Sequence, residues 1–361
     1  MTEKIILPIR KPQIDCYPDL ANLFSILDCY DDAQSWLVTH FYQLIYRRDS
    51  QNFENSFANF LDIMRIGNDI YAYQYCPNLY INLIDKHLIC DKFKDIFSFI
   101  FYCLQKQTYI QMYINKHYIP YGTPVAFDFM HETFIYGIDF QRKYVYLADF
   151  FDGKYQQINC DFFHFENAYL NSFEDNAYFQ SDIYFKYPHM TKYNMNKIVL
   201  IKTCNSRPYF CDKKIIISKL YDYIEAKNSF GRVTESYIAD RYTFYYGIEF
   251  YNQLILDLRN HNFDIRKPYV LLSHKLLFKK QLTLWSTFNF ITSSKLKKLM
   301  AQIDDLINIS TLLYRKYLKM LYSPQKSLNS IHILCNDYES FKTKDINFVK
   351  NCLTILEKSI L

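Results

Sequence analysis

Glycine, tryptophan and long apolar runs are scarce in this chain of 361 residues. Six residues are glycine and two are tryptophan, and no apolar stretch reaches the 18 residues that a membrane-spanning helix requires. The opening MTEKIILPIRKPQ is too polar to be typical of a signal peptide. We therefore expect a cytoplasmic protein that has no membrane span and no membrane partner.

The ten cysteines lack the spacing of a metal site. No two of them form a CxxC pair, and Cys204 and Cys211, which lie closest together, have no second pair to complete a zinc centre. We therefore expect neither a metal nor a cofactor bound by this chain. In the cytoplasm the thiols should stay reduced, so that one of them can serve as a nucleophile.

Apolar residues, by contrast, are plentiful and make up 50% of the chain, with 35 Tyr and 31 Phe among them. This is enough to build more than one hydrophobic core, and 361 residues exceed the size of one typical core. The texture along the chain changes from helical spacing to extended aromatic runs and back to helical spacing. The helical segments are 19–28, 33–48, 91–107, 211–229, 247–262, 269–291, 294–321 and 345–360, and the extended segments are 108–120, 122–130, 131–140, 143–151 and 196–204.

This order predicts an α+β fold in which helices pack on an antiparallel sheet, followed by a helical C-terminal part. We expect two domains, residues 1–204 and 205–361. Their charges differ: residues 1–195 contain 16 Lys and Arg against 23 Asp and Glu, whereas residues 196–361 contain 26 against 14. The positive excess predicts either an acidic protein partner or only a solvated helical surface, and nucleic acid is disfavoured because no motif for it accompanies the dispersed lysines.

The tripeptide Asp-Cys-Tyr occurs twice, around Cys16 and around Cys29. Pro18 and Asp19 are typical of the first turn of a helix, so Cys16 is expected at the positive end of the helix dipole. Cys29 follows the same helix at its negative end, where a thiolate is disfavoured. Most cysteines are small buried apolar residues, but if one of these two is a nucleophile, the helix dipole favours Cys16.

A cysteine nucleophile needs an imidazole and a group that orients it. His131 begins one predicted strand and Asp149 ends the next, with a turn near Asp139 between them. In an antiparallel hairpin the start of the first strand lies beside the end of the second, so we expect His131 and Asp149 to be neighbours. Other histidines are expected to be structural or exposed: His40 in a helix, His117 and His164 without a comparable carboxylate, and His189 in a loop.

The helix-starting Cys16, followed by HETFIYGIDF and KYVYLADF, resembles the papain-like cysteine peptidase fold in its bacterial branches. Within that fold the chain resembles proteins that are like the N-terminal domain of butirosin biosynthesis protein H, and the closthioamide amide synthetase. Residues 148–169 resemble the stretch that follows the triad Asp in that group, and residues 245–260 resemble its helical C-terminal portion. The resemblance thus identifies 1–204 as a papain-like catalytic domain.

The resemblance implies a Cys16, His131, Asp149 triad used for acyl transfer. An acyl or peptidyl group, presented on the phosphopantetheine of an acidic carrier protein, would pass through a Cys16 acyl-enzyme to a small amine or diamine. Such chemistry belongs to antibiotic and other secondary-metabolite biosynthesis, including nonribosomal peptides. The carrier protein and the amine are the expected partners.

The chain departs from the papain-like pattern at the oxyanion hole. The expected Gln lies several residues before the Cys, but position 10 is Arg and the nearest candidate is Gln13. The Cys16 backbone N–H supplies a second donor. Asp128 and Glu132 flank the proposed base and are candidate amine contacts, although turn or surface charges are more usual roles.

Two other functions remain open at this point. A cysteine peptidase or amidase would use the same triad with water as the acceptor. A catalytically inactive binding or scaffold protein is also compatible with the fold, but such a protein often lacks one triad member, and all three are present here.

Overall fold

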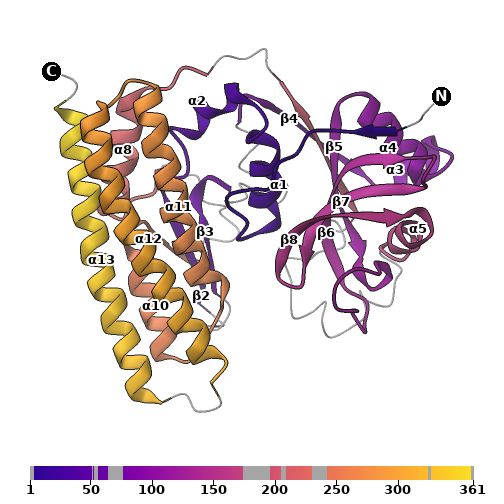
Figure 1. Cartoon of the computed structure of the whole chain (residues 1–361). Coiled ribbons are helices and arrows are strands. Elements are labelled where there is room, and N and C mark those ends of the chain that lie inside the picture. Colours follow the sequence, from indigo (N-terminus) through magenta and orange to yellow (C-terminus); the bar gives the residue numbers. More distant parts are fainter. Residues whose placement is uncertain are drawn as a thin grey trace. The chain divides into compact units, whose positions relative to one another are not determined.

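The structure, a computed structural model, describes residues 4–50, 52, 56–63, 76–173, 196–204, 209–229, 242–323 and 327–358 (Figure 1). The fold is α+β, with antiparallel sheets and a helical C-terminal part, as the sequence predicts. The chain forms two compact units, one of residues 1–31 and 74–208 and the other of residues 32–73 and 209–361. The predicted domain boundary at 204 is close to the division at 208, but residues 32–73 lie in the second unit.

The first unit is built on a seven-stranded antiparallel sheet. Its strands run in the order β4, β9, β5, β6, β7 and β8, and β1 pairs with the end of β6. The strands are β1 (Lys4–Ile6), β4 (Leu79–Asp85), β5 (Thr108–Asn115), β6 (Met130–Asp139), β7 (Tyr144–Phe151), β8 (Lys154–Asp161) and β9 (Lys197–Thr203), and the helices are α1 (Pro18–Leu27), α3 (His87–Lys92), α4 (Ile96–Gln105) and α5 (Phe162–Leu170).

Both faces of this sheet are covered by helices. Directly opposed residues of antiparallel strands project to the same face, so Gln111, Phe134 and Ala148 share one face, as their register requires. The side chain of Asn22 on α1 donates to Gln111 Oε1 at 3.0 Å, which puts α1 on that face. We call it the α1 face. Figure 1 shows α4 and α5 on the other side of the sheet.

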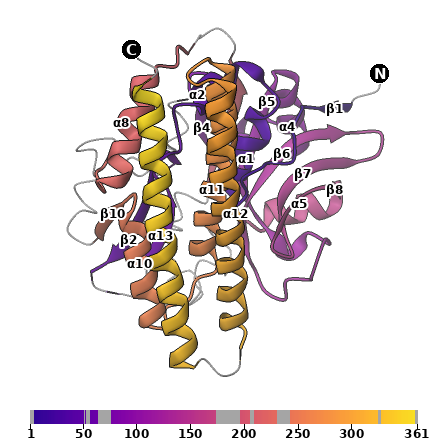
Figure 2. The ribbon, with the colours of Figure 1, turned by 60° about the vertical axis from the view of Figure 1, so that its left-hand side comes forward.

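The second unit combines a small sheet with long helices. Strands β2, β3 and β10 form an antiparallel sheet with β2 in the centre. Helices α11, α12 and α13 lie side by side (Figures 1 and 2), and α10 and α8 pack against α13. The elements are α2 (Gln34–Leu37), β2 (Leu44–Asp49), β3 (Ser56–Phe60), α8 (Lys213–Ile224), β10 (Tyr242–Tyr246), α10 (Glu249–Arg259), α11 (Arg266–Thr287), α12 (Ser293–Leu321) and α13 (Leu328–Glu357).

Two sequence-based assignments are wrong. The predicted helix over 33–48 is only a single turn, α2, followed by strand β2. Phe41 has a positive φ of 67°, which ends any helix, and the following residues pair with β3 and with the distant β10. The predicted strand over 122–130 is irregular up to residue 129, since Gly122 has a φ of +73° and Asp152 caps the backbone N–H of Thr123 at 2.8 Å.

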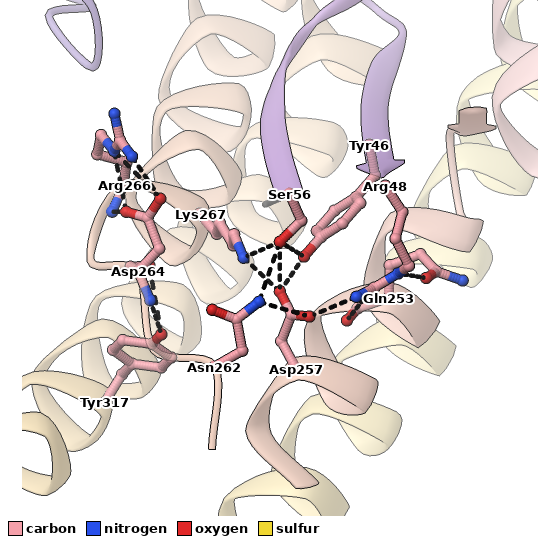
Figure 3. A network of polar contacts seen from close by, with 10 residues as sticks. All are labelled: Tyr46, Arg48, Ser56, Gln253, Asp257, Asn262, Asp264, Arg266, Lys267 and Tyr317. Carbon is pink, nitrogen blue, oxygen red and sulfur yellow. Dashed lines mark hydrogen bonds and ion pairs between the residues drawn. The ribbon is translucent and has the colours of Figure 1, made fainter. Parts of the chain in front are cut away.

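A buried polar network holds β2 against α10 and α11 (Figure 3). Asp257 on α10 accepts from Arg48 at 2.9 Å and forms close contacts with Lys267 and with the hydroxyl of Tyr46. The side chains of all four residues are buried or nearly so. Figure 3 also shows Asn262 and Ser56 completing the ring around the carboxylate. A strand predicted as helix is thus fixed by residues more than 200 positions later.

A second buried carboxylate, Asp345 on α13, joins four helices. It accepts from Lys275 of α11 at 2.6 Å, from Tyr223 of α8 at 2.7 Å and from Tyr251 of α10 at 2.9 Å. Burial alone would raise the pKa of Asp345, but the Lys275 ammonium and the other partners hold it below its usual value. The charged form of Asp345 is therefore part of the core of the second unit.

Candidate active site

The β6–β7 hairpin brings His131 and Asp149 together. Nδ1 of the imidazole lies 2.8 Å from Oδ1 of the carboxylate, a close polar contact that lacks the alignment of a hydrogen bond. Thr133, two residues further along β6 and on the same face, donates to Oδ2 of Asp149 at 2.9 Å. The geometry that the sequence predicts for these two residues is therefore present in the first unit.

Asp149 is the fixed centre of this cluster. Its side chain is 1% exposed, and besides the hydroxyl of Thr133 it accepts from the backbone N–H of Phe150 at 2.6 Å. Lys116 lies 3.3 Å from Oδ2. Burial alone would raise the pKa of Asp149, but the imidazole, the Lys116 ammonium and the Phe150 N–H together lower it. The carboxylate is thus ionised at neutral pH and oriented on both oxygens.

Sequence reasoning missed Lys116. In the stretch INKHYIP it looks like a surface residue of a turn, whereas its side chain is only 8% exposed. The available signal was its position directly after β5, because the strand that pairs with β6 ends beside the start of β6. Its backbone N–H continues that pairing by donating to the carbonyl of Phe129 at 2.8 Å.

His131 is positioned to act as a base. Its side chain is 21% exposed, and its ring lies 5.5 Å from that of Phe129, centroid to centroid. A proton on Nδ1, facing the carboxylate, leaves the lone pair on Nε2 for an incoming proton. An imidazole that is partly exposed and backed by a buried carboxylate is the arrangement that general-base catalysis needs.

Cys16 directly precedes helix α1. The helix has Pro18 at its first position, Asp19 in its first turn and Tyr17 as an extended N-cap with φ −145° and ψ 154°. Cys16 is 6% exposed and lies on the side of the positive end of the helix dipole. The predicted helix is confirmed, and its first turn has the residues that the sequence indicates.

Cys29 has a different environment at the other end of α1. Its thiol donates to the carbonyl of Ser25 at 3.4 Å. Burial raises the pKa of the Cys29 thiol, the nearby Asp28 adds to this, and Arg10 opposes it. Cys29 is therefore a protonated thiol at neutral pH, which fits a packing role.

The register also shows from which face each group approaches. His131, Thr133 and Asp149 project to the face opposite the α1 face, since they alternate with Phe134 and Ala148. Helix α1 runs on the α1 face with its first turn toward the start of β6, because Asp19 accepts from Gln111 at 3.3 Å whereas Tyr30, just after the helix, contacts Tyr109 nearer the start of β5. Cys16 lies beyond that turn, so it can meet the imidazole only around the strand ends.

A side-chain hydrogen bond also links β8 of the sheet to helix α1. Tyr155 on β8 donates to Oδ1 of Asn22 on α1 at 2.7 Å. Burial raises the pKa of Tyr155, and the charges of Asp149 and of Asp15 raise it further. Asp15, the neighbour of Cys16, and Asp149 therefore act on the same phenol. A direct pairing of Cys16 with His131 belongs to the proposal below.

Three further residues, Gln13, Asp128 and Glu132, are predicted to contribute to the site. Gln13 is exposed in the segment before α1. Asp128 accepts from Asn115 at 2.7 Å, which gives it a role in the loop before β6. Glu132 is buried and alternates with His131, so it belongs to the α1 face.

Among the other histidines, His164 is about 40% exposed, as predicted, but a carboxylate does lie beside it. Its Nδ1 is 2.6 Å from Asp161, the N-cap of α5. His117 contacts the carbonyl of Val125 at 2.6 Å. His40 is half-buried and stacks on Trp36, and burial lowers its pKa to about 4. His189 lies outside the described residues.

The described residues contain no cluster of three or more His, Cys, Asp or Glu side chains that could hold a metal ion. No helix in the described ranges is long and apolar enough to cross a membrane. None of the ten cysteines is paired in a disulfide in this structure. A scan of the chain against models of protein families finds no match, and a search of curated proteins finds no relative.

Proposed function

We propose that this chain is a cysteine-dependent acyltransferase or amide synthetase with a papain-like catalytic unit. The observation that carries the proposal is the buried, ionised Asp149 paired at 2.8 Å with the partly exposed His131. Cys16, at the positive end of α1 and at the same end of the sheet, is the nucleophile of this proposal.

The reaction proceeds in two halves. His131 accepts the proton of the Cys16 thiol, and the thiolate attacks the carbonyl of a carrier-bound thioester. The tetrahedral adduct collapses, the carrier thiol leaves with the proton from His131, and an acyl-enzyme remains on Cys16. An amine then attacks this acyl group and transfers a proton to His131, and the amide leaves as Cys16 is restored. Asp149 stabilises the imidazolium in both halves.

The carrier protein is the proposed macromolecular partner. Residues 196–361 contain 26 Lys and Arg against 14 Asp and Glu, and Lys297, Lys298 and Lys319 are exposed on α12. Carrier proteins are acidic, so complementary charge would steer their approach. Their phosphopantetheine would deliver the acyl group as a thioester, and no cofactor of the chain itself takes part in the steps above.

The experiment combines an acyl-pantetheine thioester with a panel of amines and diamines and measures amide and free acid by mass spectrometry. We expect amide from the wild-type chain and from Cys29→Ala, and none from Cys16→Ala. Free acid alone, together with cleavage of peptides, would favour the peptidase or amidase alternative. Equal activity in Cys16→Ala and the wild type would refute the proposal.

A further inference from the structure

Lys116 is the charged group that the mechanism above leaves without a role. It follows β5 as the first residue of a single 3-10 turn, Lys116–Tyr118. Because its backbone pairing with Phe129 continues the ladder in which Ile114 opposes His131, its side chain falls on the same face as His131. It is one of the few lysines of the first unit with a buried side chain.

The ammonium of Lys116 is held in place by three contacts. It lies 3.3 Å from Oδ2 of Asp149, donates to the carbonyl of Phe150, and is 4.3 Å from the ring centroid of Phe151. The two carboxylate oxygens are thereby divided: Oδ2 faces Lys116 and Thr133, and Oδ1 faces His131. This division fixes the carboxylate in the orientation that meets the imidazole.

The charges of Lys116, Asp149 and His131 give Lys116 a second effect. With a neutral imidazole, Lys116 and Asp149 sum to zero, whereas protonation of His131 leaves one buried positive charge in excess. Asp152 also lies close enough to be stabilised by Lys116, but its side chain is exposed and screened by solvent. Asp128 is bonded to Asn115, and Glu132 projects to the α1 face.

We propose that Lys116 is a positioning residue for the proposed acyl transfer: it orients Asp149 and opposes protonation of His131, so that the imidazole is free to accept the thiol proton. The inference rests on the proposed function for its role in turnover. The coupling between Lys116 and the imidazole, however, can be measured without turnover.

The test is an NMR titration of the His131 imidazole in the full-length chain, with the signal assigned by its loss in His131→Gln. In Lys116→Met the midpoint of the titration should move up by about one to two pH units, because a positive charge that contacts the same carboxylate as the imidazole is removed from a partly buried site. Lys116→Arg retains the charge and should stay within about half a unit of the wild type. Lys202→Met, at an exposed lysine of β9, is the matched control and should not move it.

Activity gives the second readout. The acid limb of the pH–rate profile for amide formation should move up in Lys116→Met by the same amount, and Lys116→Arg should restore it. Lys116→Gln is prepared alongside, with circular dichroism as the check on folding. An unmoved midpoint in folded Lys116→Met or Lys116→Gln overturns the role of Lys116. A moved midpoint in a chain that forms no acyl adduct supports the coupling and contradicts only the proposed function.

Discussion

Removal of the Asp345 charge should strongly destabilise the second unit. In Asp345→Asn the Lys275 ammonium, whose side chain is 0% exposed, loses its counter-ion and must either stay buried as an unpaired charge or give up its proton. The hydroxyls of Tyr223 and Tyr251 also lose a charged acceptor. Breaking a buried ion pair by removing one partner typically costs about 3–5 kcal/mol. For a unit of this size, we expect the unfolding temperature to fall by about 6–20 °C.

The measurement is guanidinium unfolding followed by circular dichroism, with calorimetry to separate the two units. The matched control is Asp337→Asn, because Asp337 pairs with Lys316 at the same 2.6 Å distance but with side chains 34% and 44% exposed. Exposed pairs contribute about 1 kcal/mol or less. The double variant Asp345→Leu with Lys275→Met should recover most of the loss, since no unpaired charge is left buried. A loss in Asp345→Asn no larger than that in Asp337→Asn would refute the reasoning.

Three other predictions concern the backbone, the pH dependence and the carrier. Gly247→Ala should lower the unfolding free energy by about 3 kcal/mol or more, because φ is +50° and the added Cβ would lie 2.1 Å from the Tyr223 carbonyl oxygen. Gly153→Ala, where the Cβ would enter open space at φ +71°, should lower it by only about 1 kcal/mol. Equal losses in the two variants would contradict this prediction. Since the pKa of folded Asp149 is lowered, its contribution to stability is present above about pH 4 and is lost as pH falls through the folded value. In urea titrations at several pH values, the unfolding free energy of Asp149→Asn should therefore fall less steeply toward acid pH than that of the wild type. An unchanged slope would show that the ionised form of Asp149 is not stabilised by folding. Lys297→Glu with Lys298→Glu should raise KM for a carrier-bound thioester several-fold at low salt and leave the reaction of a small acyl-pantetheine unchanged; equal effects on both substrates would argue against docking on α12.

The parts of the fold that the sequence predicts well are those set by local signals. The pair Pro18-Asp19 predicts the start of α1, and the turn near Asp139 predicts the hairpin that joins β6 and β7. Because the hairpin is local, it also predicts that His131 and Asp149 are neighbours. The assignment of a catalytic role to them is still a prediction.

The parts that the sequence does not predict depend on long-range partners. Residues 44–49 carry apolar side chains at positions compatible with either helix or strand, and their state is decided by pairing with β10, nearly 200 residues away. The same holds for buried cations. Lys116, Lys267 and Lys275 look like ordinary surface lysines in the sequence, and only the folded chain sets them beside Asp149, Asp257 and Asp345.

The sequence also does not predict on which face of the sheet Cys16 lies relative to His131 and Asp149. Strand alternation predicts that His131 and Asp149 share a face, but it does not predict on which face α1 packs. The bond between Asn22 and Gln111 answers this, and in the proposed mechanism Cys16 therefore approaches His131 around the strand ends.

The most direct test is intact-protein mass spectrometry of the chain mixed with an acyl-pantetheine thioester, followed by peptide mapping of the adduct. The account predicts one acyl group on Cys16, formed equally in Cys29→Ala, absent in Cys16→Ala, and slowed at least a hundredfold in His131→Ala. An adduct on Cys29, or an adduct on Cys16 that forms as fast without His131, would contradict it.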